Sequence, residues 1–276
     1  MSIADKIFVE NIKDILGCGY SDRDLDVRPR WTDGVPAHTV KKFCLVNRYD
    51  LTKEFPIITV RKTNFEAAID ELLWIWQKKS NVVSELSSRI WDAWQDKNGT
   101  IGKAYGYQLG VKHKYKEGEF DQVDRVLFDL KNNPQSRRIL TNIYVHADLA
   151  EMQLYPCAYS MTFSTSGSTL NAILNQRSQD MIVANNWNVA QYAALTHMLA
   201  QVTGLKVGEF VHVIADAHIY DRHIPIAEEL TKRPQYPAPK LIINPEVRDF
   251  YKFKTSDFKL DNYQFTPLGT KLEVAV

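Results

Sequence analysis

The chain has few cysteines, and their spacing excludes several classes of protein. Among the 276 residues, only Cys18, Cys44 and Cys157 carry a thiol. Their number is odd, they lie far apart in the sequence, and the chain has no C-x-x-C motif or His/Cys cluster with metal-ligand spacing. We therefore expect no disulfide framework and no metal site. Unpaired cysteines are typical of a reducing compartment, so we predict a cytoplasmic protein.

The chain also lacks a net excess of charge and a long apolar run. Its 34 Lys and Arg residues are balanced by 33 Asp and Glu residues, which does not indicate a surface for nucleic acids or anionic membranes. No run approaches the roughly 20 apolar residues of a membrane-spanning helix, and the N-terminal residues lack the apolar region of a signal peptide. We therefore expect neither DNA nor a membrane as a partner, and any anion site must be local.

Hydrophobic spacing predicts helices and strands in mixed order, which is typical of an α+β fold. A hydrophobic content of 45% in a chain of this length suits one sizeable core, so we predict a single domain over residues 1–276. The expected helices are 3–16, 65–77 and 189–205. The expected strands are 57–60, 139–145, 160–165, 169–176, 207–214 and 240–243, with a polar turn at 216–223.

Cys157 lies between two arginine sites, Arg137-Arg138 before it and Arg177 after it. Neighbouring cations lower the pKa of a thiol and increase the fraction of nucleophilic thiolate. The hairpin signal Ser166-Gly167-Ser168 places Cys157 and Arg177 on neighbouring strands. The pattern indicates a nucleophile that meets an anionic substrate. The alternative is a buried structural cysteine, which is how we interpret Cys18 and Cys44.

Glu71 occupies an unusual position, inside the apolar helical run Ile69-Asp70-Glu71-Leu72-Leu73-Trp74. Burying an unpaired carboxylate is costly. Glu71 must therefore face a polar site or have a raised pKa, unless its side chain simply points to solvent.

Several short motifs, in order along nearly the whole chain, resemble the folate-dependent thymidylate synthase family. Any one of them would be weak, but their joint order is specific. They are Glu71-Leu72-Leu73-Trp74, Ile90-Trp91-Asp92-Ala93-Trp94, Ala104-Tyr105-Gly106-Tyr107-Gln108, Ser136-Arg137-Arg138, Pro156-Cys157, Gln176-Arg177-Ser178-Gln179-Asp180-Met181, Trp187-Asn188-Val189, Asp216-Ala217-His218-Ile219-Tyr220 and Val274-Ala275-Val276.

The resemblance implies a large mixed β-sheet covered by helices, with one sheet face forming a homodimer interface. It also implies reductive methylation of dUMP by 5,10-methylenetetrahydrofolate, which yields dTMP and dihydrofolate. Uracil C5 is unreactive until a nucleophile adds at C6, and Cys157 matches that nucleophile. Glu71 matches the residue that organises proton transfers near uracil O4, and Tyr105 lies where the C5 proton leaves.

The resemblance assigns the nucleotide phosphate to arginines and one serine, as a dianion requires. Arg28, Arg177 and Ser178 match the phosphate residues of one subunit. Arg137 and Arg138 match arginines that come from the other subunit, so the active sites would be shared. The sequence around Arg28 departs from the family, which leaves Arg30 as an alternative.

Three further residues match the nucleoside contacts of the family. Asn188 can donate and accept at once, which suits the O4 and N3–H edge of uracil. It could also act as an N-cap for the following helix. His218 and Tyr220 match the ligands of the sugar 3′-hydroxyl.

The folate would stack between apolar walls and be held by one carboxylate. Asp180 matches the carboxylate that binds the pterin nitrogens, and Ala275-Val276 match a tail that closes over the folate. With Asn188, Asp180 is also expected to take part in catalysis. The wall positions are Ile90, Trp91, Trp94, Leu154 and Trp187.

Two departures from the family limit what the resemblance implies. Ala158 stands where many members have a histidine after the nucleophile, so the arginines must activate the thiol. The segment 183–187 replaces a loop that contains glycine and proline in the family and lies beside the folate.

A related nucleotide hydroxymethylase acting on dUMP or dCMP, in which water captures the intermediate, remains an alternative. A non-catalytic nucleotide- or RNA-binding relative is another.

Overall fold

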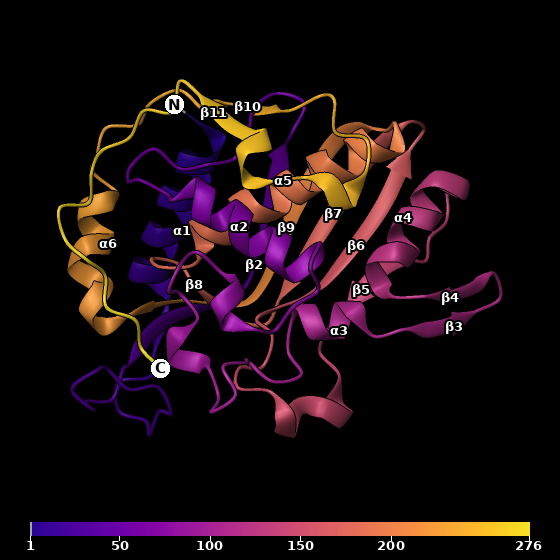
Figure 1. Cartoon of the computed structure of the whole chain (residues 1–276). Helices are drawn as coiled ribbons and strands as arrows, with labels where there is room; N and C mark the ends of the chain where they lie inside the picture. Colours follow the sequence, from indigo (N-terminus) through magenta and orange to yellow (C-terminus); the bar gives the residue numbers. More distant parts are fainter. Residues whose placement is uncertain (1) are drawn as a thin grey trace.

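The computed structural model describes residues 2–276 and has a mixed β-sheet at its centre (Figure 1). The strands are ordered β1-β2-β9-β7-β6-β5, and β8 also pairs with β9. Strands β7 and β8 run parallel to β9, and the other pairs are antiparallel. The sheet consists of β1 (Tyr20–Ser21), β2 (Thr39–Asp50), β5 (Ile139–Asn142), β6 (Ala158–Ser166), β7 (Thr169–Gln176), β8 (Gln179–Asp180) and β9 (Lys206–Tyr220).

Two small hairpins lie outside this sheet. They are β3 (His113–Tyr115) with β4 (Gly118–Phe120), and β10 (Lys240–Ile243) with β11 (Phe258–Asp261). The β3–β4 hairpin projects from the side of the molecule in Figure 1. Strand β10 matches the prediction for 240–243.

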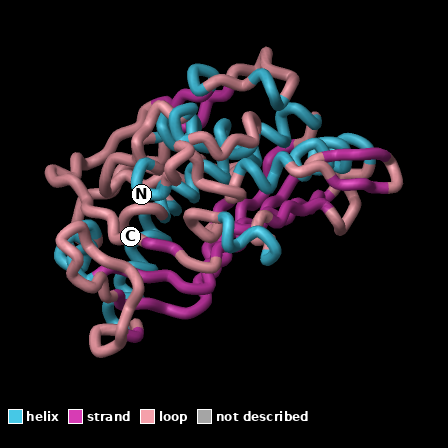
Figure 2. Tube along the Cα trace, turned by 60° about the horizontal axis from the view of Figure 1, so that its bottom comes forward, coloured by secondary structure: helices cyan, strands magenta, loops and turns pink. Residues whose placement is uncertain are grey.

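Helices cover the sheet. The central helix α5 packs on β7 and β9, α2 packs on α5, and α1 packs on β2. Figure 2, in which helices are cyan and strands magenta, shows helices lying alongside strands in a second view. No helix within residues 2–276 is long and apolar enough to cross a bilayer. The α-helices are α1 (Ile3–Cys18), α2 (Phe65–Trp76), α3 (Gly106–Gly110), α4 (Gln122–Asn132), α5 (Asn185–Thr203) and α6 (Ile224–Leu230). Short 3-10 turns lie at Val83–Glu85, Asp92–Trp94, His146–Glu151, Asp221–His223, Phe250–Lys252 and Thr255–Asp257.

The three long helices confirm the predictions from apolar periodicity. Helix α1 begins after Ser2, whose hydroxyl accepts a hydrogen bond from the backbone N–H of Asp5. Helix α5 ends at Gly204, which adopts a left-handed conformation with φ 75°. The start of α5 differs from the prediction, because it begins at Asn185 and not at Val189.

The β6–β7 hairpin is also confirmed, and it positions the predicted nucleophile. Ser166 pairs with Thr169 across the turn, and Ala158 pairs with Gln176 at the open end. Just beyond that end, the backbone N–H of Arg177 donates to the carbonyl oxygen of Cys157 at 3.0 Å. The hairpin therefore brings Cys157 and Arg177 together.

Two predicted elements are wrong, in each case because distant partners determine the backbone. The segment 57–60 is not a strand, since the Asp5 carboxylate accepts from the backbone N–H and the hydroxyl of Thr59 at 2.7 and 2.6 Å. The predicted polar turn at 216–223 is largely strand. Strand β9 continues to Tyr220 because its last residues pair with Thr39–Phe43 of β2, and only 221–223 form a turn.

One row across the sheet carries exposed apolar side chains. Leu140, Thr162, Ile173, Val211 and Arg48 are successive cross-strand partners from β5 to β2. Cross-strand partners lie on the same face of a sheet. Leu140 is 49% exposed and Ile173 is 37% exposed, so this face carries apolar area that the helices do not cover.

Candidate active site

A pocket opens between the loop that follows β1 and the last part of β9. Its volume is about 350 Å³, which lies in the usual range of small-molecule sites, roughly 300–1,000 Å³. The predicted residues Arg28, Arg177, Ser178, His218 and Tyr220 all line it. The other lining residues are Asp22, Val27, Pro29, Ala37, Thr39, Lys41 and Asp216.

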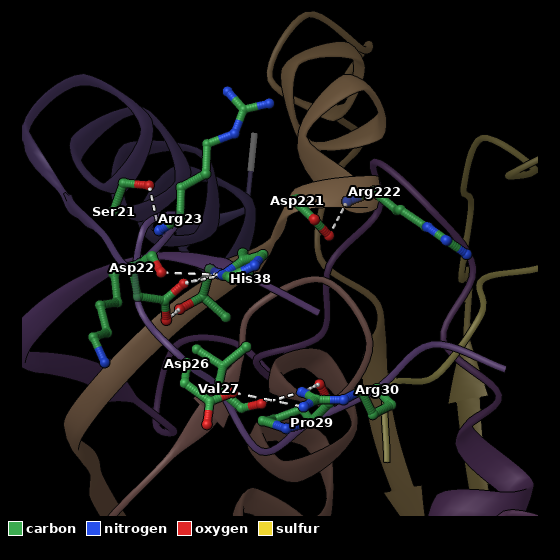
Figure 3. Close-up of polar contacts among 12 residues, drawn as sticks. Ser21, Asp22, Arg23, Asp26, Val27, Pro29, Arg30, His38, Asp221 and Arg222 are labelled. Atoms are coloured by element: carbon green, nitrogen blue, oxygen red, sulfur yellow. Dashed lines mark hydrogen bonds and ion pairs between the residues drawn. The ribbon is translucent and has the colours of Figure 1, made fainter. Parts of the chain in front are cut away.

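Arg28 lines the pocket, whereas Arg30 is turned into its own loop. The Arg30 Nη1 donates to the carbonyl oxygens of Val27 and, at 3.1 Å, of Pro29 (Figure 3). Its Nη2 also lies 3.7 Å from Asp26 Oδ1. These contacts occupy the guanidinium, so the geometry favours Arg28 over the alternative Arg30 as an anion ligand.

Asp216 orients His218 at the wall of the pocket. Asp216 Oδ1 lies 2.8 Å from His218 Nδ1, and Lys41 Nζ lies 3.5 Å from Asp216 Oδ2. Burial raises the pKa of the Asp216 carboxyl, but the His218 hydrogen bond and the Lys41 charge outweigh it and leave the pKa below its usual value. Burial also raises the pKa of Tyr220 to about 12, so its hydroxyl keeps its proton at neutral pH.

The Cys157 thiol lies beside Arg177, which lines this pocket. The distance from Cys157 Sγ to Arg177 Nη2 is 3.7 Å. Arg177 is itself held by the carbonyl oxygens of Tyr155 and Pro156, at 2.7 and 3.1 Å. Burial raises the pKa of the thiol, whereas Arg177, a hydrogen bond with Tyr105 and the charge of Arg28 lower it, and burial outweighs them.

This balance shows how much the arginines of one chain contribute to the thiol. The arginine neighbours in one chain do lower the pKa of the Cys157 thiol, but by less than burial raises it. Arg137 and Arg138 contribute nothing within the chain, because both are exposed in the turn before β5 and neither lines the pocket.

Tyr105 adopts a strained backbone next to the thiol. Its φ is 47° and its ψ is −108° at the start of α3, a conformation that non-glycine residues rarely adopt. Its hydroxyl accepts from the backbone N–H of Cys157 at 3.1 Å, and its ring lies 5.0 Å from that of Trp91. Burial raises the pKa of Tyr105 well above its ordinary value, so the phenol is neutral.

Glu71 is buried among hydrogen-bond donors, which excludes the solvent-facing alternative. Its Oε1 accepts from Trp91 Nε1, and its Oε2 accepts from Trp187 Nε1 and Gln191 Nε2, each at 2.5 Å. Burial raises the pKa of the carboxyl above its ordinary value, although these three donors oppose the shift. A buried carboxyl with a raised pKa is typical of a group that exchanges protons at an active site.

Asn188 lies within α5 and is not its N-cap. The helix begins at Asn185 after Ala184, and the backbone N–H of Asn188 donates to the carbonyl oxygen of Ala184 at 3.0 Å. The capping interpretation is therefore wrong. Its amide instead joins side chains on both sides, accepting from Gln176 Nε2 at 3.4 Å and donating to Gln191 Oε1 at 3.2 Å.

Asp180 and a buried arginine hold the segment that departs from the family. Asp180 Oδ1 accepts from the backbone N–H groups of Ile182 and Val183, at 2.8 and 2.9 Å. Arg61 Nη2 donates to the carbonyl oxygens of the same two residues. Both carboxylate contacts use Oδ1, which leaves Oδ2 available to a ligand.

Two of the predicted wall residues, Trp91 and Trp187, contact Glu71. Trp91 is buried, its ring lies 5.7 Å from that of Trp94, and Trp187 is partly buried. Ile90 is 38% exposed and Leu154 is partly buried.

The C-terminal tail, with Ala275, is held against the loop that carries Arg28. The backbone N–H of Arg30 donates to the Val276 carbonyl oxygen at 2.8 Å, and the Val276 N–H donates back at 3.0 Å. Glu273 accepts from the backbone N–H of Thr32 at 2.9 Å and from Arg222 Nη1 at 3.1 Å. Ala275 therefore lies next to the loop from which Arg28 lines the pocket.

Several residues of the site escaped sequence reasoning. Lys41 and Asp216 line the pocket, and Gln191 and Gln176 contact Glu71 or Asn188. Charged and amide residues are common on strands and helices. Only the contacts in the folded structure therefore distinguish these four site residues from other polar residues. Asp216 offered one signal, because it stands two positions before His218 on the same strand face.

The site as a whole combines a thiol, an anion pocket and a buried carboxyl. Within residues 2–276, no group of three or more His, Cys, Asp or Glu side chains is arranged to hold a metal ion. Such a fold and site define an enzyme class in which a cysteine stands beside a pocket for an anionic substrate.

Comparison with known proteins identifies the family within this class. The family model described as thymidylate synthase matches residues 6–276. A thymidylate synthase of Bacillus phage phi3T is 47% identical, and thymidylate synthase 1 of Bacillus subtilis strain 168 is 46% identical, each over the full length of both chains. The solved structure of thermostable thymidylate synthase A from Bacillus subtilis superposes with a TM-score of 0.94 at 45% identity, covering 99% of both chains. The chain belongs to the thymidylate synthase family, whose members are methyltransferases.

Proposed function

We propose that the chain acts as a single catalytic domain that methylates dUMP to dTMP and converts 5,10-methylenetetrahydrofolate to dihydrofolate. The observation that supports this most is the position of Cys157 Sγ, 3.7 Å from Arg177 Nη2. Arg177 is also part of a pocket whose other cations and hydroxyls suit a nucleoside monophosphate.

The proposed first step is addition of the Cys157 thiolate to uracil C6. A carbon–sulfur bond forms, and the electron pair of the C5–C6 bond moves toward O4. Asn188 would donate to O4 and accept from N3–H, which stabilises the developing negative charge. Arg28, Arg177 and Ser178 would hold the phosphate, and His218 and Tyr220 the sugar hydroxyl.

The folate supplies the one-carbon unit and the hydride when it is bound. Asp180 would hold its pterin through Oδ2, against the walls formed by Ile90, Trp91, Trp94, Leu154 and Trp187, with Ala275 closing the site. Glu71, whose pKa is raised by burial, would exchange protons near O4. Tyr105 would help remove the C5 proton through water. Breaking the Cys157–C6 bond then releases the product.

Two further properties belong to this proposal. We propose a homodimer in which the open sheet face that carries Leu140 and Ile173 forms the interface, since apolar area on a sheet suits an isologous contact. Arg137 and Arg138 of the partner subunit would then reach the phosphate. A cytoplasmic location is consistent with thiols that are free in the described residues.

The reaction is tested with dUMP tritiated at C5 and methylenetetrahydrofolate, by measuring tritium release and dihydrofolate absorbance together. We expect both in equal amounts, and neither from the Cys157→Ser variant, which should still bind dUMP. Tritium release without dihydrofolate would identify a hydroxymethylase instead. Binding of dUMP with neither product would favour a non-catalytic nucleotide binder.

The shared active site is tested by mixing two inactive variants. Arg138→Ala should lack a phosphate ligand for its partner, and Cys157→Ser should lack the nucleophile. After refolding together at equal amounts, half of the dimers should be hybrids with one intact site of two. We therefore expect about one quarter of the wild-type activity if the sites are shared across an isologous dimer. Activity no higher than that of the separate variants contradicts sharing.

A further inference from the structure

A chain of side-chain hydrogen bonds runs from the buried carboxyl through Asn188 to a histidine in the centre of the sheet. Gln191 Nε2 donates to Glu71 Oε2 at 2.5 Å, and Asn188 Nδ2 donates to Gln191 Oε1 at 3.2 Å. Gln176 Nε2 donates to Asn188 Oδ1 at 3.4 Å, and His212 Nε2 lies 2.5 Å from Gln176 Oε1. The chain joins α2, α5, β7 and β9.

An amide can be rotated to exchange its oxygen and nitrogen, so its direction requires a fixed partner. At one end, Gln191 Nε2 faces Glu71 and also the carbonyl oxygen of Ala68, at 3.0 Å. A backbone carbonyl only accepts. The Gln191 amide nitrogen must therefore point there, and its oxygen points to Asn188.

At the other end, His212 supplies the fixed direction. It is fully buried, and burial lowers its pKa to about 3, so the ring is neutral. Among the described residues its Nδ1 has no partner, so a proton on Nδ1 would be a buried donor without an acceptor. His212 therefore carries its proton on Nε2, which donates to Gln176 Oε1. Gln176 consequently turns its nitrogen toward Asn188.

Gln179 does not supply this direction. Its Oε1 also accepts from Gln176 Nε2, but its own Nε2 is buried without a partner in residues 2–276. A Gln179 amide that has a single partner can rotate together with Gln176. The carbonyl oxygen of Ser178 also accepts from Gln176 Nε2, but at 3.5 Å, the outer limit of a hydrogen bond. His212, at 2.5 Å from Gln176 Oε1, is therefore the nearer of the two groups that favour this orientation of Gln176.

We propose that His212 is a positioning residue for base selection, which acts through Gln176 to fix the orientation of the Asn188 amide. This inference rests on the proposed role of Asn188 as the uracil ligand. With both ends fixed, the remaining Asn188 N–H and lone pair offer a donor for O4 and an acceptor for N3–H. A rotated amide would offer the reverse, which matches the N4 amino group and N3 of cytosine.

The test compares the affinities for dUMP and dCMP by titration calorimetry, using the full chain. His212→Leu removes the donor, and His212→Gln restores one. His197→Leu is the matched control, because His197 is also a neutral histidine, with a pKa lowered to about 4 by burial, and contacts Phe55 instead of the amide chain. We expect His212→Leu to lower the dUMP/dCMP affinity ratio about tenfold, as loss of one orienting hydrogen bond would. His212→Gln should recover most of the ratio, and the control should keep it.

Several results would overturn the inference. They are an unchanged ratio in folded His212→Leu, an equal fall in His197→Leu, no recovery in folded His212→Gln, or a wild-type chain that binds dCMP as well as dUMP. If His212→Leu does not fold by circular dichroism, Gln176→Glu tests the same link. It keeps the acceptor for His212 but places a carboxylate oxygen against Asn188 Oδ1, so the ratio must fall.

The outcome is separable from the proposed function. A wild-type chain that prefers dUMP but forms no dihydrofolate would contradict the methylation reaction, and the binding ratios of the variants would still decide the role of His212.

Discussion

Replacing Arg177 by glutamine should slow alkylation of Cys157. The Arg177 guanidinium lies 3.7 Å from the sulfur and is the group that most lowers the pKa of a thiol whose pKa burial raises. Without that charge, the thiolate loses its nearest cation. Since the thiolate is the reactive form, the alkylation rate at a given pH must fall.

The size of the effect follows from the distance and the surroundings. Two unit charges about 4 Å apart interact by ~1 kcal/mol in bulk water and by ~4 kcal/mol at the intermediate dielectric of a protein surface. Cys157 is partly accessible to solvent, so the value for bulk water gives the smallest effect to expect. A loss of ~1 kcal/mol corresponds to a rate about fivefold lower at neutral pH.

The assay requires a chain in which only one thiol reacts. Cys18 and Cys44 are exposed, so both are first changed to serine. Iodoacetamide labelling of Cys157 is then followed by mass spectrometry between pH 6 and pH 10. The profile of Arg177→Gln should move to higher pH than that of the parent chain.

Arg177→Lys is the control for this experiment. It keeps the charge but loses the fork that binds the carbonyl oxygens of Tyr155 and Pro156. If charge controls the thiolate, the lysine variant should retain most of the rate. Equal rates for the parent and Arg177→Gln would refute the electrostatic explanation, and equally slow lysine and glutamine variants would point to loop geometry instead.

Two further predictions concern Asn188 and Glu71. Asn188→Asp should shift turnover from dUMP toward dCMP, since a carboxylate accepts from the cytosine amino group; unchanged turnover of both nucleotides would contradict the base-site assignment. Because the pKa of Glu71 is raised in the fold, its contribution to stability is complete below the unfolded value of about 4.3 and is lost as the pH rises through the folded value. Glu71→Gln, which stays neutral, should therefore gain melting temperature relative to the parent chain between pH 4.5 and pH 7.5, measured by scanning calorimetry. A relative loss over that range would show that the three donors outweigh burial.

The local sequence pattern was sufficient to predict the main helices and the hairpin that contribute to the hydrophobic core. The apolar spacing in α1, α2 and α5 and the turn residues of the β6–β7 hairpin act within a few positions of the sequence. The predictions failed where a partner lies far along the chain. Thr59 bonds Asp5, and the end of β9 pairs with the start of β2, so no local window contains the reason for either conformation.

The residues of the candidate site show the same difference between what a local sequence pattern predicts and what only the folded contacts reveal. Cys157, Arg177 and His218 could be found because their motifs are short and chemically distinctive. Gln191 could not, since a glutamine inside a helix has no signal of its own, yet it supplies one of the three donors to Glu71. The start of α5 at Asn185 also determines which way Asn188 faces, and the capping pattern predicted that start incorrectly.

The electrostatics of the thiol depend on the assembly as well as on the fold. Proximity in sequence placed two arginine sites on either side of Cys157, but the fold brings only Arg177 of these beside the sulfur. Arg28 joins from a distant loop, and the two together do not outweigh burial. Arg137 and Arg138 are exposed at the far end of β5. In the proposed dimer they would add positive charge to the pocket, so formation of the thiolate and formation of the dimer would be coupled, and a single subunit would hold its nucleophile mainly in the protonated form.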